Sequence, residues 1–159
     1  MSVKKEAIFP SEMAKPWVAY SPVVKAGPLV FVSGQVASDF VTGIPKSVEV
    51  NTNFPHHGSR IERQTRFICN NLNRCLKAAG SSLERSLFMM AFYTDARELN
   101  DAARILESSF GREKQPPTTS VILEELPVPG CSLEIDMIGL APESEHKIET
   151  LRPASLPAP

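Results

Sequence analysis

Residues 59–93, SRIERQTRFICNNLNRCLKAAGSSLERSLFMMAFY, decide the fold of this chain. Ser59 followed three positions later by Glu62 is the signature of a capping box at the start of a helix. The apolar face that follows recurs at helical spacing and stops at Gly80. This predicted face consists of Ile61, Thr65, Ile68, Leu72, Cys75 and Ala79. Residues 86–93 are apolar almost throughout, which is typical of a strand covered on both faces, so we expect an amphipathic helix leading into a central strand.

The segment before this stretch reads as a hairpin preceded by an arm. Residues 20–25 and 29–35 are rich in valine and are separated by Ala26-Gly27-Pro28, which favours two strands joined by a short turn. Residues 39–55 form a polar connection with a turn at Thr42-Gly43. Residues 1–18 are polar and interrupted by prolines, and we expect them to form an irregular N-terminal arm.

The segment after this stretch predicts one more helix and two more strands. Asp95 with Glu98 suggests a second capping box, and the helix ends at Gly111. Its predicted buried face consists of Leu99, Ala102, Ala103, Leu106 and Phe110. Residues 119–126 and 132–140 read as strands around a turn at 127–130. Residues 142–159 are rich in proline and are expected to be a C-terminal tail.

The resulting order, β-β-α-β-α-β-β, predicts an α+β domain over residues 19–141, with a mixed sheet and both helices on one face. A chain of 159 residues fits one such domain. Two helices cover only one face of the sheet. We therefore expect a closed homo-oligomer to cover the other.

Composition narrows the classes of partner. The formal net charge of −1 leaves no electrostatic footprint for nucleic acid or an anionic membrane. No apolar run approaches the roughly 18 residues of a membrane span, and the first ten residues do not resemble a secretory signal. Three cysteines fit no disulfide or zinc framework and favour a reducing compartment. We expect a cytoplasmic protein with no nucleic-acid or membrane partner.

Several segments, taken in order, resemble the RidA (YjgF-type) enamine/imine deaminase family over about residues 20–141. They are YSP at 20–22, LVFVSGQV at 29–36, QTRFICNNLNRCLKAAGSSL at 64–83, YTD at 93–95 and LPVPGCSLEIDMIGLA at 126–141. The resemblance implies a chorismate-mutase-like α+β fold, a homotrimer, and small-molecule sites in the clefts between subunits. It also implies hydrolysis of a reactive enamine or imine, such as 2-aminoacrylate, to a ketone and ammonia without metal or cofactor.

The resemblance assigns roles to individual residues. Tyr20 matches the aromatic residue that lines the cleft, and Gly34, after Ser33, matches the glycine whose backbone borders the pocket. Glu134 matches the carboxylate that positions or activates water. Ser120 falls where the family has a small thiol or hydroxyl residue near the substrate. In isolation Glu134 also reads as an acidic residue on the solvent face of a strand.

Two polar positions of the family are absent. Thr118 occupies the place of the arginine that grips a substrate carboxylate, and Ala103 occupies the place of an asparagine. Losing a charge-assisted pair worth about 1.5–3 kcal/mol implies a substrate other than 2-aminoacrylate, unless Arg60 or Arg104 reaches the cleft. Thr118, Thr119 and Ser120 either form a hydroxyl-lined cradle or simply begin a strand.

Two further alternatives stand beside the deaminase reading. The same trimer could be a non-catalytic protein that binds a small metabolite or a partner. His56-His57 resembles a metal pair, yet it lacks further ligands at useful spacing and reads as an exposed loop. We therefore expect neither a metal nor a cofactor.

Overall fold

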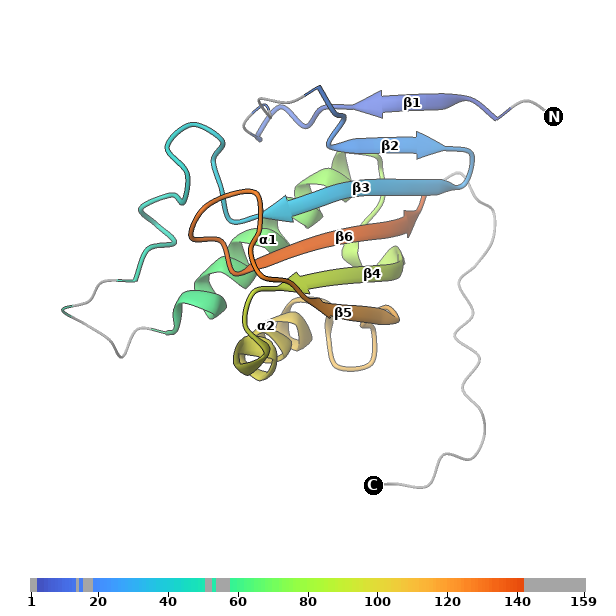
Figure 1. Cartoon of the computed structure of the whole chain (residues 1–159). Coiled ribbons are helices and arrows are strands. Elements are labelled where there is room, and N and C mark those ends of the chain that lie inside the picture. The colour runs from blue at the N-terminus through green and yellow to red at the C-terminus, as the bar shows by residue number, and fades with distance from the viewer. Residues whose placement is uncertain (1–2, 14, 16–18, 51–52, 54–57, 142–159) are drawn as a thin grey trace, which may run out of the picture.

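A six-stranded mixed sheet forms the framework of the chain, and two α-helices pack against it (Figure 1). The computed structural model describes residues 3–13, 15, 19–50, 53 and 58–141. The strands are β1 (Lys5–Ile8), β2 (Val23–Ala26), β3 (Leu29–Val36), β4 (Ser86–Tyr93), β5 (Thr118–Ile122) and β6 (Leu133–Leu140). The helices are α1 (Arg60–Ala78) and α2 (Leu99–Phe110), with 3₁₀ turns η1 (Leu83–Arg85) and η2 (Ala96–Glu98). The predicted α+β class is confirmed.

The order of strands in the sheet is β1-β2-β3-β6-β4-β5. Every neighbouring pair is antiparallel except β4 and β5. These two strands are parallel because the connection through α2 returns the chain to the end of the sheet at which β4 begins. The last strand, β6, therefore lies between β3 and β4 in the middle of the sheet. Glu134, near the start of β6, therefore has β3 on one side and β4 on the other.

Helix α1 begins at the predicted capping box. The Ser59 hydroxyl accepts a hydrogen bond from the Glu62 backbone N–H, and the Glu62 carboxylate accepts one from the Ser59 backbone N–H. The buried face of α1 contacts β3 and β6 and also packs against α2. Gly80, with a φ of 74°, follows the end of the helix, as predicted. No helix in the described part of the chain has the length and apolarity to cross a membrane.

The two faces of the sheet differ in burial. Met89, Ala91 and Tyr93 of β4 are buried on the face that the helices cover. On the opposite face Phe88, Met90 and Phe92 remain partly exposed, so the strand predicted to be covered on both faces is covered on one within a single chain. We call this opposite surface the open face. It carries Phe31, Phe88, Met90, Phe92, Glu134, Asp136 and Ile138.

The prediction of an irregular N-terminal arm is wrong for residues 5–8. Lys5–Ile8 forms strand β1 and pairs antiparallel with β2 along the edge of the sheet. Lys5, Glu6 and Ala7 are exposed, so an apolar alternation that would reveal the strand is missing from the sequence. Backbone hydrogen bonds to β2 hold this edge strand instead.

The second helix begins differently from the prediction. Asp95 caps the 3₁₀ turn η2 by accepting a hydrogen bond from the Arg97 backbone N–H, and α2 starts only at Leu99. The expected capping box with Glu98 is therefore absent. The buried residues of α2 are Ala102, Ile105, Leu106 and Phe110, whereas Ala103 is exposed. Ala103 lies about 100° around the helix from Ala102, on the side turned away from the core.

The fifth strand is shorter than predicted. It ends at Ile122, and residues 123–130 form a loop that leads to β6. Leu126 is buried in this loop beside Val36 and Cys131, so its apolar character reflects packing of the loop. The C-terminal tail predicted at residues 142–159 lies outside the described residues.

Candidate functional site

A pocket of about 320 Å³ opens on the open face where β3, β6 and two loops meet. Four residues that the sequence nominated line it together: Tyr20, Ser33, Gly34 and Glu134. The remaining lining residues are apolar: Val36, Phe40, Pro127 and Val128. We call this cavity the Glu134 pocket. Its walls are largely apolar around one carboxylate, which suits a small organic ligand.

Glu134 and Gly34 are in direct contact. The register of β3 against β6 shifts between Val32 and Gln35, and this bulge places the Gly34 backbone against the side chain of Glu134. A Cβ at position 34 would overlap the Glu134 carboxylate oxygen and would lie 2.8 Å from its Cδ. The absence of a side chain at Gly34 therefore makes room for the carboxylate.

The surroundings favour the protonated form of Glu134. Burial raises the pKa of Glu134, and the neighbouring negative charge of Asp136 raises it further. Burial, followed by the charge of Glu134, also raises the pKa of Tyr20. A carboxyl group with a raised pKa releases and takes up a proton more readily near neutral pH, which is the property that general acid–base catalysis requires.

Hydrogen bonds fix Ser33, one of the residues that line the pocket. The Ser33 hydroxyl donates to the Ser21 carbonyl oxygen at 2.8 Å, and the Ser33 backbone N–H donates to the Pro22 carbonyl oxygen at 3.0 Å. The side-chain amide of Gln35, itself buried, donates to the Ser33 carbonyl oxygen at 2.9 Å. These bonds tie the segment that carries Tyr20 to β3 at the bulge.

Phe40 is a wall of the pocket that sequence reasoning missed. Its φ of 55° lies in the left-handed region, where a bulky residue is strained. The preceding Ser38 hydroxyl accepts from the Phe40 backbone N–H, and the Asp39 carboxylate accepts from Val41, Thr42 and Gly43. The hydrogen bond from the Thr42 side chain is the main cause that lowers the pKa of Asp39 to about 2. The Thr42-Gly43 turn was visible in the sequence, but the conformation of Phe40 was not.

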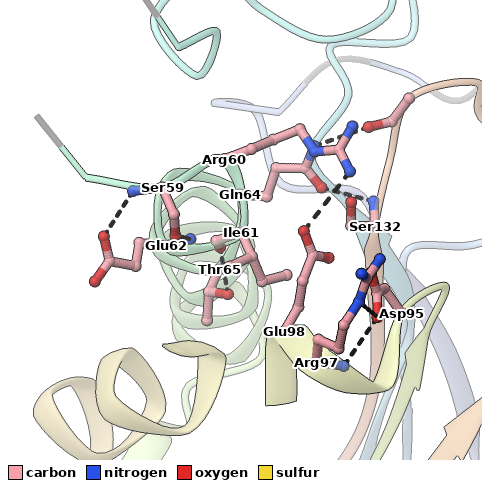
Figure 2. A network of polar contacts seen from close by, with 11 residues as sticks. Ser59, Arg60, Ile61, Glu62, Gln64, Thr65, Asp95, Arg97, Glu98 and Ser132 are labelled. Atoms are coloured by element: carbon pink, nitrogen blue, oxygen red, sulfur yellow. Dashed lines mark hydrogen bonds and ion pairs between the residues drawn. The ribbon is translucent and has the colours of Figure 1, made fainter. Parts of the chain in front are cut away.

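Gln64 fixes the strand that carries Glu134. This glutamine is fully buried in α1, and its amide donates to the Gly130 carbonyl oxygen at 2.9 Å. Its carbonyl oxygen accepts from the Ser132 backbone N–H at 2.7 Å, and Figure 2 shows Gln64 directed toward Ser132. A polar residue on the apolar side of a helix was the available signal. Gln64 thereby holds the chain between the pocket wall at Val128 and Glu134.

Arg60 and Arg104, the two arginines that the sequence offered as anchors for a substrate carboxylate, do not line the Glu134 pocket. Arg60 forms an ion pair with Glu98 at 3.6 Å, which Figure 2 also shows. Arg104 contacts Asp101 at 2.6 Å and Glu62 at 3.6 Å on the helical side of the molecule. Among the described residues that line the Glu134 pocket, neither arginine appears.

Strand β5 does not reach the Glu134 pocket within one chain. Thr118 and Ser120 pair with Met89 and Ala91, which places their side chains on the helix-covered side of the sheet. Thr119 pairs with Met90 and lies on the open face. All three are exposed, and the Thr118 hydroxyl donates to the Pro116 carbonyl oxygen at 3.0 Å. A role for these hydroxyl groups beside Glu134 requires a second copy of the chain.

No group of three or more histidine, cysteine, aspartate or glutamate side chains is arranged as metal ligands among the described residues. The His56-His57 pair lies outside them. The groups that the candidate site offers to a ligand are the Glu134 carboxylate, the aromatic side chains and the backbone of its lining residues.

Fold and pocket together define a small α+β domain with a carboxylate-bearing cavity on the open face of its sheet. The family model described as Endoribonuclease L-PSP matches residues 11–141. The chain belongs to this family, which is the RidA/YjgF superfamily that the sequence resembled.

Individual relatives cover most of the chain. The RutC family protein PH0854 of Pyrococcus horikoshii is 30% identical over 123 residues, which are 77% of this chain and 88% of that protein. The RutC family protein YjgH of Escherichia coli is 28% identical over 144 residues, 89% of this chain and 98% of that protein. The structure of Escherichia coli TdcF with bound serine matches with a TM-score of 0.70 at 22% identity, covering 85% of this chain and 98% of TdcF.

Proposed function

We propose that this chain hydrolyses a small reactive enamine or imine to a ketone and ammonia. The observation that carries the proposal is the half-buried Glu134 carboxyl, which is packed on the Gly34 backbone in a small pocket and has a raised pKa. The superfamily includes imine deaminases, and its members bind small molecules. The TdcF structure holds serine, a ligand similar in size to the small enamine or imine proposed here.

The chemistry requires one group that accepts and then returns a proton. Water attacks the carbon of the protonated imine while Glu134 takes one proton from the water, so that the carbon–nitrogen double bond becomes a single bond in a neutral carbinolamine. Protonated Glu134 then returns this proton to the nitrogen. The carbon–nitrogen bond breaks, ammonia leaves, and the hydroxyl proton passes to Glu134 and from there to solvent, which leaves the ketone. Tyr20 and the Gly34 backbone orient the ligand in this scheme.

We propose further that the active form is a homotrimer. The open face presents Phe31, which is 40% exposed, and the β5 edge presents Ile122 and Leu123, which are 48% and 38% exposed. Two different apolar surfaces on one chain suit a head-to-tail interface that closes into a ring. In that arrangement Thr118, Thr119 and Ser120 of one subunit approach the Glu134 pocket of the next.

The cysteines suit a reducing compartment, and we propose a cytoplasmic location. Cys69, Cys75 and Cys131 are free and buried. Burial raises the pKa of each thiol, to about 12 for Cys75, so each behaves as a small apolar residue.

The test generates imines in place and follows their decay. The enamine 2-aminoacrylate and a series of bulkier imines are produced by auxiliary enzymes, and release of ketone and ammonia is measured with and without the purified chain. We expect the chain to hydrolyse at least one of these imines faster than the imine hydrolyses spontaneously. Failure to accelerate any member of the series would contradict the proposed activity.

A second candidate function is a non-catalytic trimer that binds a metabolite or a partner. In its favour stands what the resemblance implies for two positions, since it matches Thr118 and Ala103 to an arginine and an asparagine of typical deaminases. A chain that is inert on every imine, but gains activity in Thr118→Arg, would support this binding function. Activity in the wild-type chain would exclude it.

A further inference from the structure

A second, larger pocket lies beside the Glu134 pocket. It has a volume of about 840 Å³, and its lining includes Lys5, Lys15, Tyr20, Val24 and Ser33. We call it the lysine groove. Tyr20 and Ser33 also line the Glu134 pocket, so the two cavities adjoin each other at these side chains.

Strand β1, which the sequence did not predict, contributes Lys5 to this groove. Lys5 pairs with Ala26 and Ala7 pairs with Val24, so Lys5 and Ala7 share one face of the β1–β2 ribbon. Val24 in turn pairs with Phe31, which belongs to the open face. Strand β1 therefore brings the Lys5 ammonium group to the same side of the sheet as Glu134.

The two cavities carry opposite charges. Among their described lining residues, the lysine groove has two cations and no carboxylate, whereas the Glu134 pocket has one carboxylate and no cation. A ligand anion placed directly against Glu134 would be repelled by it. An anion placed in the groove would instead meet two ammonium groups while the rest of the ligand extended toward Glu134.

We propose that the lysine groove binds a carboxylate at the far end of a ligand whose reacting carbon lies beside Glu134. The inference rests on the proposed function for the position of the reacting carbon. Because Tyr20 and Ser33 separate the two cavities, the carboxylate and the reacting carbon are several bonds apart. The substrate class is thus an imine of a longer oxo acid, in which the carboxylate does not adjoin the imine carbon.

The exposure of the two lysines limits how much their charges contribute to carboxylate binding. Lys5 and Lys15 are both exposed, and exposed ion pairs are individually weak and are screened by salt. Removing both charges is expected to weaken carboxylate binding roughly fivefold at low salt. High salt is expected to remove most of this difference.

The experiment measures equilibrium binding of stable ketones by NMR titration, so it does not depend on turnover. The probes are 4-oxopentanoate and the uncharged ketone 2-pentanone. The variants are Lys5→Gln/Lys15→Gln, the charge-preserving Lys5→Arg/Lys15→Arg, and Lys46→Gln as an exposed lysine that lines neither cavity. We expect only the first variant to bind 4-oxopentanoate more weakly than wild type. No variant should change the affinity for 2-pentanone.

The outcomes separate this inference from the proposed activity. Equal affinity of the wild type and the double glutamine variant for 4-oxopentanoate overturns the lysine groove, whether or not the chain hydrolyses imines. An equal loss in Lys46→Gln overturns it as well, because the effect would then be one of net charge. Selective loss in the double glutamine variant supports the groove even if the wild type is inert on imines.

Discussion

Glu134 and Gly34 depend on each other at the scale of single residues. The carboxylate occupies space that any side chain at position 34 would fill, and the β3 bulge brings the two residues together. The resemblance nominated both residues from the sequence. Their contact could not be predicted, because it depends on the register between two strands that are about 100 residues apart in the chain.

This contact predicts a coupled pair of substitutions. Gly34→Ala is expected to lower the free energy of unfolding by about 1–3 kcal/mol, since the new methyl group overlaps the carboxylate. In a Glu134→Ala background the same change should cost little, because the overlapping group is gone. Urea unfolding of the four proteins gives the coupling. An equal cost in both backgrounds would show that Glu134 is not the group that position 34 accommodates.

The raised pKa of Glu134 predicts a pH dependence of stability. In the unfolded chain this carboxyl titrates near its ordinary value of 4.5, whereas in the folded chain it holds its proton to higher pH. The folded state therefore binds more protons in this range, and its free energy of unfolding falls as pH rises through the raised pKa. Glu134→Gln removes this loss, so the stability of the variant relative to wild type should increase from pH 4 upward.

Urea unfolding across pH 4–8 measures this difference. Glu124→Gln, at an exposed glutamate in the loop after β5, makes the same change in net charge and serves as the control. A stability difference between Glu134→Gln and wild type that stays constant over the whole range would contradict the raised pKa.

At the scale of elements, local signals sufficed where a helix or strand buries a regular apolar face. The capping box and spacing of α1 and the apolar run of β4 are of this kind; the structure confirms the helix and the strand, while the described residues cover only one face of that strand. Strand β1 was missed because three of its four residues are exposed and no apolar alternation marks it, and α2 began late because Asp95 caps a 3₁₀ turn. The walls at Phe40 and Val128 come from loops, whose course depends on tertiary hydrogen bonds.

Gln64 provides a prediction for the link between α1 and β6. Gln64→Ala removes two hydrogen bonds and leaves the Gly130 carbonyl and the Ser132 N–H without this partner. We expect a loss of about 2–4 kcal/mol in the free energy of unfolding. Gln115→Ala, at an exposed glutamine, should change it by less than about 0.5 kcal/mol. Comparable effects of the two substitutions in urea unfolding would remove Gln64 from this role.

At the scale of the whole molecule, the described residues leave one face of the sheet uncovered. Counting two helices against one sheet predicted this from the sequence, and the partly exposed Phe88 and Met90 agree with it. Counting helices and strands could not predict which residues of a second copy complete the site. None of the three hydroxyl residues of strand β5 lines the Glu134 pocket of its own chain, and Thr118 and Ser120 lie on the helix-covered face, so their contribution depends on the geometry of a second copy.

The proposed assembly predicts a mass of three times the 17.4 kDa of the chain in multi-angle light scattering. Phe31→Lys places a charge on the open face and should lower the mass toward that of one chain. Val41→Lys changes an apolar residue that is 72% exposed in the loop after β3, and this control should remain trimeric. A monomeric wild type would contradict the assembly and the approach of β5 to a neighbouring pocket.

The central claim is that Glu134 carries the proton in imine hydrolysis. The most direct measurement compares wild type with Glu134→Gln on the imine that wild type hydrolyses fastest, following ammonia release above the spontaneous rate. Glutamine keeps the size of the side chain but cannot accept a proton from water, so we predict that kcat falls roughly 10²- to 10⁴-fold. A Glu134→Gln protein that folds normally and retains the wild-type rate would contradict the account.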